Sequence, residues 1–66
     1  MRFTEDEYAA AVALVKENRK VSVSFLNRKM QIGMNRAADI IARMEQERLV
    51  TPPNMAGRRE VLIPQE

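Results

Sequence analysis

The side chains best suited to chemistry in this chain lie along one predicted helix and are of the types that read DNA bases. Asn35 and Arg36 stand together at its start, Asp39 follows about one turn later and Arg43 one turn after that. Arginine can donate two hydrogen bonds to guanine O6 and N7, and asparagine can bind adenine similarly. Because a helix fits the major groove and usually touches bases with its first residues, we predict that Arg36 reads guanine and that Asn35 contacts a base or the backbone.

Other basic side chains are placed to hold the phosphate backbone. We predict phosphate contacts for Arg28, Lys29 and Arg43, which lie on the two helices of a predicted helix-turn-helix. Arg58 and Arg59 lie in a predicted hairpin, which in a winged helix often reaches a neighbouring groove or the backbone. These residues complete a candidate surface for double-stranded DNA.

The charge distribution agrees with a polyanionic partner. Residues 1–18 carry a net charge of −2, whereas residues 19–59 hold nine basic and three acidic side chains, a net +6. An acidic start followed by a basic body is typical of a domain with one side facing nucleic acid. An ordinary solvated surface with local variation in charge is an equally good interpretation of this feature taken alone.

Each candidate residue also has a purely structural interpretation. Arg36, Asp39 and Arg43 could form a ladder of salt bridges on a solvated helix face. Asn35 could simply cap its helix. Helix-turn-helix sequences also occur in domains that bind other proteins. A protein-interaction module that docks on a recombinase or another DNA-processing protein is therefore the alternative function.

The composition argues against an enzyme. The 66 residues include no His and no Cys, which removes the commonest acid–base side chain, thiolate nucleophiles and most zinc sites. No phosphate-binding loop of the G-x-x-x-x-G-K-[ST] type is present. We expect no catalytic residue, no cofactor, no metal and no small-molecule substrate.

The hydrophobic pattern argues against a membrane protein. No apolar run approaches the roughly 20 residues that a membrane span needs, and no signal-peptide pattern opens the chain. We expect a cytoplasmic protein that does not bind a membrane.

A first helix is predicted over residues 5–18. Thr4 and Glu7 have the T-x-x-E spacing of a capping box, and Phe3 and Tyr8 stand at the flanking positions where hydrophobic side chains pack. The expected buried stripe of this helix consists of Tyr8, Ala11, Val12 and Val15.

A helix-turn-helix is predicted next. Val21-Ser22-Val23 has the alternation of a short bridge strand, and Ser24 is a plausible N-cap for a second helix. Gly33 is expected to end that helix in a left-handed conformation. The third helix should begin near Met34 or Asn35 and end near residue 47. Its expected buried stripe consists of Ala37, Ile40, Ile41 and Met44.

The end of the chain is predicted to form a hairpin. Leu49-Val50-Thr51 can extend as a strand, Pro52-Pro53 stops it, and residues 59–63 read as the returning strand. The order of helix, short strand, two helices and hairpin is that of a winged helix-turn-helix. We therefore predict one α+β, mainly α domain over residues 1–66, with an ordered core at about 4–64.

Four sequence runs carry a family resemblance. They are E-N-R-K-V-S-V at 17–23, I-G-M-N-R-A-A at 32–38, M-E at 44–45 and G-R-R-E-V-L at 57–62. From about Tyr8 to Pro64 the chain resembles the gamma domain at the C-terminal end of FtsK-type bacterial DNA translocases. The resemblance implies a winged helix that recognises a G-rich, direction-giving chromosomal sequence, with several copies side by side. It also implies contact with the XerD tyrosine recombinase during chromosome dimer resolution.

The resemblance assigns roles to single residues, and this chain departs from the family at three places. Asn35 and Arg36 fall on the family's recognition-helix positions, and Arg59 falls on its wing arginine. The family usually has an aromatic residue in place of Met34, a second Arg in place of Asp39, and N-G-N-R in place of A-G-R-R at 56–59. An aspartate at a base-facing position repels phosphates and favours a cytosine N4 donor over guanine.

The chain is too short to contain an ATP-driven motor. Nothing in 66 residues could hydrolyse ATP, so the motor of such a translocase is missing from this sequence. We expect either an excised domain or a stand-alone phage or plasmid protein. The second case would make a small regulator of transcription or of a DNA site.

Overall fold

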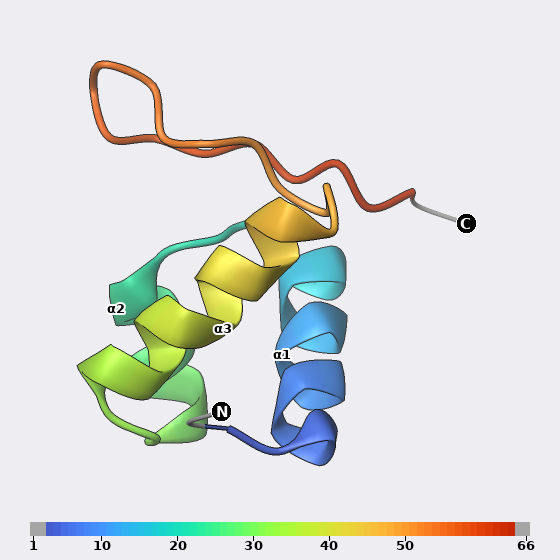
Figure 1. Cartoon of the computed structure of the whole chain (residues 1–66), viewed down its shortest axis with the longest axis vertical. Helices are drawn as coiled ribbons and strands as arrows, with labels where there is room; N and C mark the ends of the chain where they lie inside the picture. The colour runs from blue at the N-terminus through green and yellow to red at the C-terminus, as the bar shows by residue number, and fades with distance from the viewer. Residues whose placement is uncertain (1–2, 65–66) are drawn as a thin grey trace.

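The computed structural model describes residues 3–64, which contain three helices. Helix α1 spans Glu5–Asn18, α2 spans Val23–Met30 and α3 spans Met34–Gln46. After α3 the chain runs out as an arm, turns near residues 54–57 and returns beside itself, so that the arm projects from the helical body (Figure 1). The three predicted helices are confirmed. None of those in the described range combines the length and the apolarity needed to cross a membrane.

The start of α1 is a complete capping box. The hydroxyl of Thr4 accepts a hydrogen bond from the backbone N–H of Glu7 at 3.1 Å, and Oε1 of Glu7 accepts one from the N–H of Thr4 at 3.0 Å. Phe3 and Tyr8 stack beside it, with ring centroids 5.8 Å apart. The predicted cap is therefore confirmed. The helix buries Tyr8, Ala11 and Val15, whereas Val12 is only partly buried.

The start of α2 corrects two predictions. Ser22, rather than Ser24, is the N-cap, and its hydroxyl accepts a hydrogen bond from the N–H of Phe25 at 3.0 Å. The bridge strand predicted over residues 21–23 does not form, because Val23, the last residue of that range, is already the first residue of α2. Two serines two positions apart can both cap, and in the structure the earlier one does.

The turn between α2 and α3 corrects a third prediction. Gln31, rather than Gly33, is the left-handed residue that ends α2, with φ 55° and ψ 46°. Gly33 is instead the N-cap of α3, with φ 91° and ψ 151°. Asn27 joins both, because its carbonyl accepts from the N–H of Gln31 at 2.7 Å and its side-chain oxygen from the N–H of Gly33 at 2.9 Å. A side chain at Gly33 would strain this backbone.

The arm contains less β-structure than predicted. Its two sides meet at a single antiparallel bridge between Val50 and Val61, and the N–H of Thr51 donates to the carbonyl of Glu60 at 2.9 Å. Within residues 3–64 no longer ladder is present, so the predicted two-stranded hairpin is not confirmed. Pro52-Pro53 accounts for this, because proline has no N–H to continue the ladder.

The core lies where the three helices meet under the base of the arm. α3 turns the predicted stripe of Ala37, Ile40, Ile41 and Met44 into it. The arm contributes Val50 and Ile63, which are 1% and 7% exposed. The base of the arm is thus anchored in the core, while residues 52–58 are exposed.

Candidate nucleic-acid interface

The outer face of α3 is the most open surface that this helix presents. On the side away from the buried apolar stripe, four small or polar residues are exposed along one face, and they are Asn35, Ala38, Ala42 and Gln46. The two alanines let another surface approach the helix backbone closely. Asn35 stands in the first turn, and within residues 3–64 its side chain forms no hydrogen bond. It is therefore not the cap of α3, a position that Gly33 holds.

Arg36 lies on the flank of α3 that faces the start of α1. Its Nη1 donates a hydrogen bond to Oε2 of Glu7 at 3.0 Å. The side chain of Arg36 is 44% exposed and that of Glu7 is 27% exposed, so the pair is partly solvated. The predicted guanine reader thus has an internal partner 29 positions away along the chain.

Arg43 is held more firmly than Arg36. Its Nε donates to Glu47 at 3.0 Å, and its Nη1 donates to Glu5 on α1. Its guanidinium carbon lies 4.3 Å from the centroid of the Tyr8 ring, within cation–π distance. The side chain is 28% exposed. Arg43 therefore packs α3 against α1, and a phosphate contact would have to displace two carboxylates.

The contacts among Tyr8, Arg43 and Glu47 shift the pKa values of Tyr8 and Glu47. Burial, followed by the hydrogen bond to Glu47, raises the pKa of Tyr8. The hydrogen bond from Tyr8, followed by that from Arg43, lowers the pKa of Glu47. Both shifts favour a neutral phenol that donates to an ionised carboxylate.

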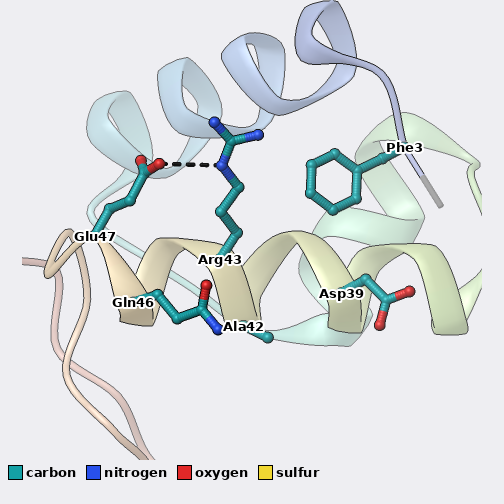
Figure 2. A pocket seen from close by; sticks show the side chains of 6 residues that line it. All are labelled: Phe3, Asp39, Ala42, Arg43, Gln46 and Glu47. Carbon is teal, nitrogen blue, oxygen red and sulfur yellow. Dashed lines mark hydrogen bonds and ion pairs between the residues drawn. The ribbon is translucent and has the colours of Figure 1, made fainter. Parts of the chain in front are cut away.

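Asp39 borders a shallow surface pocket of about 340 Å³. Figure 2 shows Asp39 and Arg43 leaving α3 in different directions, with the ring of Phe3 on the same side of α3 as Arg43. A dashed line in the same view joins Arg43 to Glu47 at the other end. The pocket is lined by Phe3, Asp39, Ala42, Arg43, Gln46 and Glu47.

The two neighbouring arginines of the arm have different surroundings. Arg59 donates to Glu45 of α3 at 2.6 Å and to the carbonyl of Thr51 at 3.2 Å, and its side chain is 22% exposed. Arg58 is exposed beside the turn, where Asn54 Oδ1 accepts from its N–H at 2.9 Å. Arg59 therefore ties the arm to α3, whereas the side chain of Arg58 points outward to solvent.

The remaining predicted phosphate contacts stand in the last turn of α2. Arg28 and Lys29 are exposed, and neither forms an ion pair within the described part of the chain. Together with Arg58, they are the candidate DNA contacts whose basic side chains form no ion pair within residues 3–64.

Sequence reasoning missed the structural role of one further arginine. Arg19 ends α1 in a left-handed conformation and donates to the carbonyl of Ile63 at 2.6 Å, which holds the end of the arm. No local sequence signal could have found a contact 44 positions away. Met34 is 50% exposed and Met55 is fully exposed at the turn of the arm.

The chain is similar to proteins named DNA translocase FtsK. Residues 3–64 match the family described as the Ftsk gamma domain. The DNA translocase FtsK of Rhizobium meliloti (strain 1021) is 51% identical over 63 residues, which cover 96% of this chain and 7% of that protein. The DNA translocase FtsK of Rickettsia bellii (strain RML369-C) is 45% identical over 64 residues, which cover 94% of this chain and 8% of that protein. The chain thus spans less than a tenth of the length of these relatives.

Proposed function

The chain belongs to the Ftsk gamma domain family, and on that premise we propose that it binds double-stranded DNA in a sequence-specific manner as a winged helix. The observation that carries the proposal is the outer face of α3, where Asn35 stands exposed beside Arg36 above two small alanines. A helix with such a face can lie deep in the major groove and present its first turn to base edges.

The surrounding charges support one way of docking. We assign base contacts to Asn35 and Arg36, and phosphate contacts to the exposed Arg28, Lys29 and Arg58. The end of α2 and the arm would then hold the backbone on either side of α3. Asp39, one turn after Arg36, would accept from the N4 amino group of a cytosine. Arg43 and Arg59, which are engaged with acidic residues, hold the scaffold in this arrangement.

The relatives are named DNA translocases, and this chain corresponds to a small part of them. We propose that its part in such a protein is recognition of the DNA, with no catalysis of its own. The absence of His and Cys from its 66 residues supports this assignment. Docking on a recombinase is the competing role, and a domain with only that role would not bind DNA.

A titration of labelled duplexes at several salt concentrations tests the proposal. Three phosphate contacts from Arg28, Lys29 and Arg58 predict a slope of log affinity against log salt of about −3, at roughly −0.9 for each phosphate. Lys29→Ala should reduce that slope by about one and weaken binding to all duplexes alike. The lack of binding to any duplex at low salt would overturn the proposal.

A further inference from the structure

We propose that Glu7 sets how strongly Arg36 contributes to DNA recognition, by competing with the DNA for the guanidinium group. This inference rests on the proposed function. It makes Glu7 a specificity-determining residue that need not touch the DNA itself. An acidic residue on a different helix would then tune the contact that α3 makes with one base pair.

The geometry fixes Glu7 in a position to compete. Its Oε1 accepts from the N–H of Thr4 at 3.0 Å in the capping box, and its Oε2 accepts from Arg36 at 3.0 Å. The cap anchors the carboxylate, so that Arg36 alone must move when the pair opens. Because Arg36 is 44% exposed, the pair is screened by solvent and can open at small cost.

The competition acts unequally on different DNA sequences. A complex in which Arg36 binds guanine through two donors requires the guanidinium to leave Glu7 and bears the cost of opening the pair. A complex with an unrelated sequence is held by phosphates, and Arg36 can stay with Glu7. The carboxylate therefore weakens binding to the preferred site more than binding elsewhere.

Glu7→Gln is a suitable variant because glutamine also completes a capping box. When its single amide oxygen accepts from Thr4, its NH2 group faces Arg36, so that two donors meet and no hydrogen bond forms. The cap is kept and the competitor is lost. Asp6→Asn is the matched control, since Asp6 lies in the same turn of α1 and undergoes the same change of charge without an ion pair to α3.

The experiment measures the affinity of four variants for two duplexes at low salt. One duplex is selected by the parent chain from a randomised pool, and the other has the same composition in scrambled order. Glu7→Gln should tighten binding to the selected duplex about two- to fivefold, the range of an exposed ion pair, and tighten binding to the scrambled one less. The gain should vanish when Glu7→Gln is added to Arg36→Ala. Asp6→Asn should give a smaller and sequence-independent gain.

Three results would overturn the inference: a gain no larger than that of Asp6→Asn, a gain that persists without Arg36, or a loss of affinity. The last would mean that Glu7 orients Arg36 toward the DNA instead of competing for it. Binding by the parent chain tests the proposed function separately. If the parent chain binds no duplex, both proposals fail, whereas normal binding without a Glu7 effect removes this inference alone.

Discussion

The hydroxyl of Tyr8 on α1 donates a hydrogen bond of 2.7 Å to Oε1 of Glu47, the C-cap residue of α3. Arg43 lies over the same aromatic ring and donates to the other oxygen of Glu47 at 3.0 Å. Tyr8 of α1 thus contacts both Arg43 and Glu47 at the end of α3, and Glu47 accepts a hydrogen bond from each of the other two side chains. Arg43, which we predicted to hold a phosphate, thus also connects α1 to the helix that we propose reads the DNA.

Tyr8 should resist ionisation while the protein is folded. Burial, together with its bond to Glu47, raises its pKa above the ordinary value of 10.0. Because the unfolded chain ionises first, this contribution to stability is fully present below pH 10 and is lost as the pH rises. Since Tyr8 is the only tyrosine, the phenolate absorbance reports it alone. We expect that absorbance to appear only above the ordinary range, together with loss of helical circular dichroism. A reversible titration at the ordinary pKa in the folded state would contradict the buried hydrogen bond.

Glu47 should contribute to stability in the acid range. Hydrogen bonds from Tyr8 and Arg43 lower its pKa below the ordinary value of 4.5. A group with a lowered pKa stabilises the fold above its unfolded value, and this contribution is lost as the pH falls through the folded one. We therefore expect the free energy of unfolding, measured in urea, to fall more between neutral pH and pH 3 in the parent chain than in Glu47→Gln. Parallel curves for the two proteins would show that the carboxylate is not linked to folding.

Arg59→Ala and Arg58→Ala should separate stability from binding at adjacent positions. Arg59→Ala removes the bonds to Glu45 and to the carbonyl of Thr51, so we expect a loss of about 1 kcal/mol in unfolding free energy. For a domain of this size that lowers Tm by roughly 4–8 °C. Arg58→Ala should leave Tm unchanged and reduce the salt dependence of DNA binding by about one phosphate. Thermal melts and duplex titrations of both variants give the measurements. A lower Tm for Arg58→Ala together with a smaller salt dependence for Arg59→Ala would reverse the two assignments.

The helices could be predicted because their signals are local. The capping box of Thr4 and Glu7 and the apolar stripe of α3 each lie within a few turns of sequence. The start of α2 was misplaced because Ser22 and Ser24 are both good caps, and only packing decides between them. Gln31 was missed because glycine and asparagine are the residues usually expected in a left-handed C-cap, and Gly33 stood two positions later.

The partners of the arginines could not be predicted in the same way. Arg36 meets Glu7 across 29 positions, and Arg43 meets Glu5 across 38. The spacing of Arg36, Asp39 and Arg43 was interpreted as one outward face. The crossing of α1 and α3 instead turns the two arginines toward acidic residues at the start of α1. Periodicity gives the face of a helix but not its neighbour.

Arg36→Ala tests the central assignment of the proposed function. If Arg36 donates two hydrogen bonds to a guanine, its removal should cost roughly 1–3 kcal/mol of binding free energy at the selected site and relax specificity at one base pair. The loss should fall toward the lower end of that range, because wild-type Arg36 must first leave Glu7. Affinities for duplexes substituted at each position of the selected site give the measurement. Arg36→Lys is the matched control, since lysine keeps the charge but lacks the bidentate geometry. A lysine variant that retained the parent's discrimination, or an alanine variant that weakened every duplex equally, would make Arg36 a phosphate contact and move base reading to Asn35 and Asp39.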